Sequence, residues 1–213
     1  MSNSLQYRIF HSDAAPLVCF SGAALLIMAS DRLAHAITVA GALVWVYGLS
    51  SLTLHAGARI FPRRGRMVLL AFLASFFAGA YLLLLWMISP LCAIESFFVV
   101  SFIPLFCMVS GILKRFETLL LEDAFVESCS EALILGVLIA IFALIREPFG
   151  FLSLSLPGGA QGTILLFSFK TESFLPVRLI ASSAGALLLL GYFLGLYRYF
   201  RTQYGIREGH NDF

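Results

Sequence analysis

The sequence predicts an all-α membrane protein with six transmembrane helices, arranged as two halves of three helices each. Of the 213 residues, 60% are hydrophobic and only 12% are charged, whereas soluble domains carry about 45–50% and about 25%, respectively. The mean hydropathy is +0.94. The apolar residues also gather in separate runs, which a lipid bilayer can solvate over their whole length.

Six such runs follow one another along the chain. They are Pro16–Ala29, Ala36–Leu54, Met67–Ile88, Phe97–Leu113, Ala132–Ile145 and Leu179–Tyr197. A helix that spans a bilayer needs about 20 residues, and the second, third and sixth runs meet this length. We expect a single membrane domain over residues 1–213, with one half at 14–88, the other at 95–200, and a cytoplasmic tail at 201–213.

The first and fourth runs differ from the others, and we expect both helices to be short or broken. Run Pro16–Ala29 is short, and the fourth run carries Pro104 near its middle. Proline removes a backbone donor and clashes with the preceding turn, so a continuous helix is not expected there. The fifth run is also short, and reaches full length only by including Ser128, Ser130 and Glu131. Interrupted segments at matching positions indicate an internal repeat with a functional site at its interface, although the residues alone leave the repeat open.

The loops predict an orientation and one long external segment. With six crossings, ten of the 14 Lys and Arg residues lie on the side that carries both termini, which places both termini in the cytoplasm. This orientation depends on the first and fourth runs crossing. The longest connection, Pro148–Pro176, includes the apolar patch Thr163–Phe169. We expect it to lie on the protein or on the membrane surface.

Composition and motifs argue against several functions. A net charge of +2 without a concentrated basic face argues against nucleic-acid binding. Four cysteines are scattered without a Cys-x-x-Cys pair: Cys19, Cys92, Cys107 and Cys129. This pattern argues against a zinc site and a disulfide framework. There is no P-loop, dinucleotide fingerprint or Ser/His/Asp arrangement, and we interpret His35 and His55 as interface residues.

Charged residues flank the fifth run at both ends. Glu131 stands at its beginning, where a carboxylate can belong to an ion path or can simply favour the dipole of a helix N-terminus. Both interpretations of Glu131 stay open. At the other end, we expect Arg146 and Glu147 to form an ion-pair anchor at the membrane face.

Three stretches follow one another in a notable order and spacing. They are IlePheProArgArgGlyArgMet (Ile60–Met67), IleProLeu (Ile103–Leu105) with Arg115 and Glu117 behind it, and AlaLeuIleArgGluProPheGly (Ala143–Gly150). Together they resemble the Rnf/Nqr family of membrane subunits in ion-translocating redox complexes, most closely the Rnf E / Nqr D type. The resemblance runs over nearly the whole chain, from about residue 14 to about residue 204.

The resemblance implies a fold, a partner and a cofactor. The fold is two inverted three-helix repeats, and the partner is a homologous subunit of the Rnf A / Nqr E type. In the family the pair holds one [2Fe-2S] cluster at mid-membrane, with one cysteine from the first and one from the fourth helix of each subunit. Here those two positions fall on Ala24 and Ser110. The expected iron ligands are therefore the nearby Cys19 and Cys107, or else this chain has lost its share of the cluster.

The resemblance also implies a function. The chain would be a subunit in the bacterial inner membrane, non-catalytic alone, of an oxidoreductase complex of ferredoxin:NAD or NADH:quinone type. It would form half of a mid-membrane electron relay and ion gate, beside other subunits that carry flavin and iron–sulfur centres. The alternative is a redox-inactive relative that acts as a small-solute or ion transporter, or as a scaffold.

Overall fold

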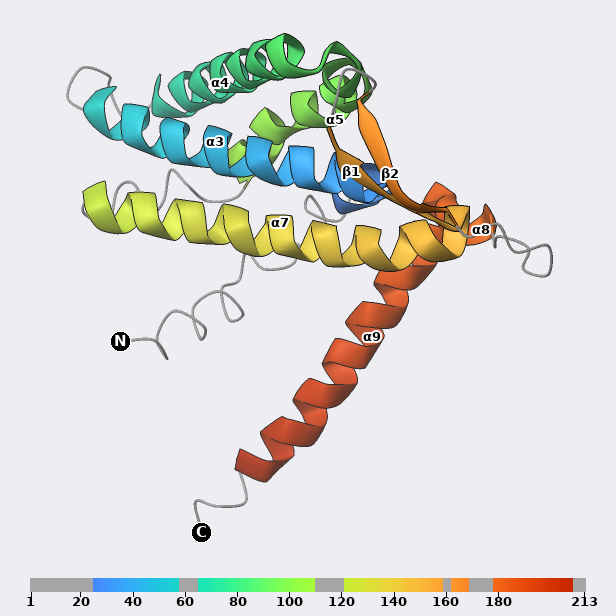
Figure 1. Ribbon diagram of the computed structural model, residues 1–213. Helices are drawn as coiled ribbons and strands as arrows, with labels where there is room; N and C mark the ends of the chain where they lie inside the picture. The colour runs from blue at the N-terminus through green and yellow to red at the C-terminus, as the bar shows by residue number, and fades with distance from the viewer. Residues whose placement is uncertain (1–24, 58–64, 110–120, 159–161, 169–177, 209–213) are drawn as a thin grey trace.

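The computed structural model describes residues 25–57, 65–109, 121–158, 162–168 and 178–208 (Figure 1). Its elements are α3 (Leu33–Gly57), α4 (Arg66–Ile88), α5 (Pro90–Val109), α7 (Leu121–Phe151), β1 (Ser153–Pro157), β2 (Thr163–Ser168), α8 (Arg178–Ala181) and α9 (Ser183–Glu208). A helical stretch at residues 25–29 precedes α3. The described part of the chain is thus mainly helical.

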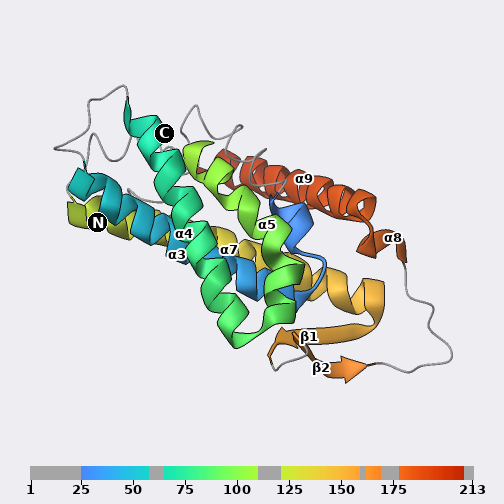
Figure 2. The same cartoon turned by 90° about the horizontal axis from the view of Figure 1, so that it is seen from above.

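Helix α3 is the centre of the bundle. It runs antiparallel to α7 along most of its length and also packs against α4 and α5 (Figures 1 and 2). In the described part of the chain, α3, α4, α5 and α7 are each long and apolar enough to cross a membrane, which agrees with a multi-pass helical membrane protein. Helix α9 leaves the bundle at an angle (Figure 1), and its apolar stretch is Ser183–Leu196.

The number of crossings and the repeat stay predictions. Most of the first run, including Cys19, lies outside the described residues. The second, third, fourth and fifth runs correspond to α3, α4, α5 and α7, and the sixth to α9. Successive helices alternate in direction, so that α3 and α5 begin, and α4 and α7 end, at the same end of the bundle. We call this the hairpin end, because β1 and β2 lie there (Figure 1).

Helix α4 shows why a bilayer suits this fold. Its buried residues, Leu70, Ala74 and Ala78, recur every four residues and are mostly small. Its large apolar side chains face outward: Val68, Phe72, Phe76, Leu83 and Met87 are 61–83% exposed. Small residues inside and large apolar residues outside are the arrangement expected when helices pack closely within lipid.

The expected break at Pro104 is absent, so this prediction was wrong. Helix α5 is continuous from Pro90 to Val109 and contains Pro104. Val100, Ile103 and Cys107 are buried and share one face of the helix, since they are spaced three and four residues apart. Packing of this face holds the helix together across the proline, as neighbouring helices commonly do in membranes.

The fifth run is also longer than expected from its apolar residues. Helix α7 spans 31 residues, includes Ser128, Ser130 and Glu131, and continues through Pro148. The Ser128 hydroxyl is buried and donates to the Ala124 carbonyl at 2.7 Å, so this polar side chain is satisfied inside its own helix.

A β-hairpin follows α7, which the all-α prediction missed. Strands β1 and β2 pair antiparallel, with a bulge between Leu154 and Ser155. The apolar patch predicted to lie on a surface is β2, and its Ile164, Leu165 and Phe167 are exposed. The Cys92 thiol in the first turn of α5 donates to the Gly162 carbonyl at 2.5 Å, which fixes the hairpin on the bundle.

Candidate functional site

Two of the residues predicted to be functional, Cys107 and Glu131, lie near one another in the bundle. Cys107 of α5 is fully buried. Its thiol lies beside the side chain of Tyr47 of α3, and Glu131 of α7 is close enough for its charge to act on the thiol. The Tyr47 ring also lies 6.2 Å from the ring of Phe106. Cys107, Tyr47 and Glu131, here called the core centre, therefore come from three different helices.

Of the two expected iron ligands, the described residues include only Cys107. Cys107 is 0% exposed and points toward Tyr47 of its own chain, so its thiol is closed off from a neighbouring subunit. Cys19, Ala24 and Ser110 lie outside the described residues. Within the ranges described, no group of three or more His, Cys, Asp or Glu side chains could hold a metal ion.

Glu131 lies at one edge of an apolar stretch whose other edge is charged as well. Fourteen residues separate it from Arg146 on the same helix, which corresponds to about 22 Å along the axis at 1.5 Å per residue. The hydrocarbon core of a bilayer is about 30 Å thick. Glu131 and Arg146 therefore lie toward opposite faces of the membrane, and Glu131 is half-buried at the end away from the hairpin.

Arg146 connects two separate helix ends to α7. Its side chain is only 2% exposed. It donates to the Ile27 carbonyl at 3.0 Å and the Ser30 hydroxyl at 3.0 Å, at the end of the helical stretch 25–29. It also donates to the carbonyls of Ile180 at 2.9 Å and Ser182 at 3.1 Å, at the end of α8. A cation is favourable at helix C-termini, where carbonyl groups lack partners.

Glu147 caps a helix N-terminus, whereas Arg146 caps helix C-termini. One carboxylate oxygen accepts a hydrogen bond from the backbone N–H of Leu33 at 2.8 Å, at the N-terminus of α3. Its other oxygen is buried and has no hydrogen-bond partner within the described part of the chain. Arg146 and Glu147, expected as an ion-pair anchor, therefore act as two helix caps. The positive charge of Arg146 stabilises helix C-termini, and the negative charge of Glu147 stabilises a helix N-terminus.

A trio of titratable residues lies at the same hairpin end. His35 Nδ1 is 2.9 Å from Asp31 Oδ1, and His35 Nε2 is 3.0 Å from Glu95 Oε2. Asp31 also accepts from the backbone N–H of Arg32 at 2.7 Å. Burial raises the pKa of Asp31, but the hydrogen bond and charge of His35 outweigh it, so this pKa lies below its ordinary value. His35, which we interpreted only as an interface residue, thus links α3 to α5.

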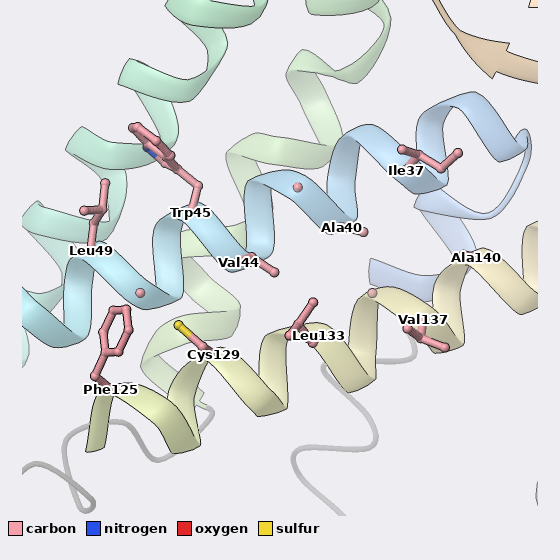
Figure 3. A pocket seen from close by; sticks show the side chains of 13 residues that line it. Ile37, Ala40, Val44, Trp45, Leu49, Phe125, Cys129, Leu133, Val137 and Ala140 are labelled. Carbon is pink, nitrogen blue, oxygen red and sulfur yellow. The ribbon is translucent and has the colours of Figure 1, made fainter. Parts of the chain in front are cut away.

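An apolar groove of about 670 Å³ lies between α3 and α7 (Figure 3). Val44 of α3 and Leu133 of α7 project into the space between the two helices, and Cys129 points toward α3 (Figure 3). The helices come close together at Gly136, where an added Cβ would stand 2.8 Å from the Cβ of Ala40. The residues that line the groove are mostly apolar, and its polar groups are those of Trp45 and Cys129.

The sequence analysis could have found part of this arrangement. Asp31 precedes His35 by four residues, a spacing that places both side chains on one helix face, but its significance was missed. Glu95 is 60 residues away, and no local pattern points to it. Neither a known family model nor a curated protein matches the chain.

Proposed function

We propose that this chain is a membrane subunit of an Rnf/Nqr-like ion-translocating electron-transport complex, and that its described helices supply the ion gate. One observation carries the gate: the Glu131 carboxylate lies at the edge of an apolar span, near enough to the buried Cys107 for its charge to act on the thiol. Ionisable groups within membrane spans are costly and commonly belong to ion or proton paths. The resemblance supplies the complex, with a homologous Rnf A / Nqr E type subunit as the partner.

The position of Glu131 suits the mouth of such a path. A half-buried carboxylate can attract a cation from water and still border the dry core. Electron transfer through the complex would add negative charge to a region of low dielectric constant, where charges interact strongly. A cation or proton bound at Glu131 would compensate that charge, and this compensation would couple cation movement to electron transfer.

The gate is tested in the whole complex, reconstituted into vesicles, with cation uptake driven by NADH or reduced ferredoxin. Glu131→Gln removes the charge with little change in shape and is expected to lower uptake at least tenfold. Glu122→Gln, on the exposed first turn of the same helix, is the matched control and should transport normally. Uptake by Glu131→Gln at the normal rate would exclude Glu131 from the path.

A redox-inactive relative, acting as an ion transporter or a scaffold, is the second candidate. Two observations favour it: α5 is continuous through Pro104, and the Cys107 thiol is enclosed by its own chain. If this chain still ligated iron, Cys107 and Cys19 would hold it, as the resemblance implies, and the group would supply a one-electron carrier.

Iron and sulfide analysis of the purified complex separates the two candidates. An electron-relay subunit predicts an electron paramagnetic resonance signal that weakens in Cys107→Ser but not in the matched Cys129→Ser. A redox-inactive subunit predicts that Cys107→Ser leaves iron content, signal and cation transport unchanged. The Cys129→Ser control is apt because Cys129 lines the α3–α7 groove and has no place in the core centre.

A further inference from the structure

The two contacts of the His35 ring determine how many protons the site must hold. Both ring nitrogens lie within hydrogen-bonding distance of carboxylate oxygens, at 2.9 Å for Asp31 and 3.0 Å for Glu95. A neutral imidazole carries hydrogen on only one nitrogen, and an ionised carboxylate can only accept. With no added proton, one of the two contacts would set a lone pair against a negative oxygen. The geometry therefore requires one proton beyond the neutral state of the ring.

We propose that Asp31, His35 and Glu95 form a proton-binding site that joins α3 to α5 at the hairpin end. The proton is held on the imidazole, because histidine is the strongest base of the three by about two pKa units in its unperturbed state. When the proton is bound, His35 donates to both carboxylates. When it leaves, one of the two bonds is lost.

The charges around the site are consistent with one bound proton. Arg32 follows Asp31 directly in the chain, and its guanidinium lies 5.7 Å from the centre of the Phe151 ring. From α7, Arg146 acts on Asp31, and Glu147 binds the Leu33 N–H. The two carboxylates of the site, Asp31 and Glu95, thus face one guanidinium group, that of Arg146, and one imidazolium makes this set neutral. Asp31 is 39% and Glu95 37% exposed, so water can deliver the proton, whereas the ring of His35 is only 15% exposed.

The site has a structural consequence for the core centre. Its two helices, α3 and α5, are those that bring Tyr47 and Cys107 together. Loss of the proton removes a contact between α3 and α5 at the hairpin end. The two helices are therefore expected to pack more tightly when the proton is bound. This inference goes beyond the proposed function and stands without it, since it concerns protonation and packing rather than electron or cation transfer.

Nitrogen NMR of histidine-labelled protein in lipid nanodiscs tests the site directly. At about pH 7, the ordinary range of the histidine switch, both His35 nitrogens are expected to carry hydrogen in the native protein. Glu95→Gln replaces an acceptor by a group that can donate, so the ring should be neutral there. Glu122→Gln is the matched control and should keep the native signals. The His35 signals are those absent in His35→Asn, or, if that variant does not fold, those that shift in Glu95→Gln.

Thermal unfolding provides the second measurement. In the folded state two ionised carboxylates hold the proton on His35, and the unfolded chain lacks these contacts. The resulting stabilisation is fully present at about pH 6 and is lost as the proton leaves at higher pH. The melting temperature of the native protein should fall between about pH 6 and about pH 8, and Glu95→Gln should lose most of this fall. A neutral His35 ring at about pH 7 in the native protein, or an identical pH profile in Glu95→Gln, would overturn the proposal.

Discussion

Arg146 and Glu147 are neighbours in the chain, yet they stabilise helix ends of opposite polarity. The Arg146 guanidinium donates to the Ile27 carbonyl at 3.0 Å, while Glu147 accepts from the Leu33 N–H at 2.8 Å. The two bonds lie on either side of the connection between the helical stretch 25–29 and α3. The C-terminal part of α7 thus fixes both sides of that connection, and its two charges are buried because helix ends provide their partners.

The first prediction concerns the hydrogen bonds that Arg146 donates to two separate helix ends. Arg146→Met would leave carbonyl oxygens of two segments without a donor, and we expect it to lower the free energy of unfolding by about 3 kcal/mol or more. Arg146→Lys should recover only part of this, since an ammonium group cannot reach acceptors on both sides as a planar guanidinium does. Denaturant titration in detergent measures the change. Arg32→Met, which removes a guanidinium from the Phe151 ring, serves as control and should cost about 1 kcal/mol or less.

The second prediction separates the two functions of the Glu147 cap. Glu147→Gln keeps an oxygen that can accept from Leu33, whereas Glu147→Leu removes it. We expect Glu147→Leu to destabilise the protein by about 1–2 kcal/mol, the usual cost of a lost N-cap, and Glu147→Gln to cost clearly less. Hydrogen exchange at the Leu33 amide should speed up mainly in Glu147→Leu. Equal exchange in both variants would show that the charge, rather than the hydrogen bond, holds the helix end.

The sequence predicted helix boundaries well where a helix is apolar along its whole length. The run Met67–Ile88 is almost the whole of α4 (Arg66–Ile88), because nearly every side chain of this helix is apolar. The prediction went wrong at Pro104, since a proline's effect on a helix depends on what packs around it. It also missed that α5 begins at Pro90, ahead of the apolar run Phe97–Leu113, so that Cys92 belongs to a helix.

The site was less predictable than the fold, for a physical reason. Cys107 and Glu131 could be singled out as rare polar groups in or beside apolar runs, but their approach to one another depends on how the helices pack. The bond between Glu147 and Leu33 spans 114 positions in sequence, and only the folded bundle brings these residues together. The hairpin was missed although Ser153–Pro157 alternates polar and apolar residues, a strand pattern.

The third prediction concerns the turn that holds the hairpin on α5. Gly162 has φ = 82°, and a Cβ there would stand 3.0 Å from the Cβ of Leu91. Gly162→Ala therefore combines an unfavourable backbone conformation, worth about 1–2 kcal/mol, with a close contact. We expect lower stability and faster modification of the Cys92 thiol by a water-soluble maleimide, because the thiol loses its bond to the Gly162 carbonyl. Gly191→Ala, which meets nothing within 4 Å, should leave both measurements nearly unchanged.

The fourth prediction tests the close approach of α3 and α7. In Gly136→Ala the new Cβ would lie 2.8 Å from the Cβ of Ala40, so the helices must move apart, at a cost of about 1–3 kcal/mol for overpacking. Adding Ala40→Gly removes the clashing group, and the double variant should regain most of the lost stability even though Ala40→Gly alone weakens a helix. Gly79→Ala on α4, with nothing within 4 Å, is the matched control and should be neutral or slightly stabilising. Because the predicted rescue requires direct contact, additive effects of the two substitutions would show that α3 and α7 do not touch at this point.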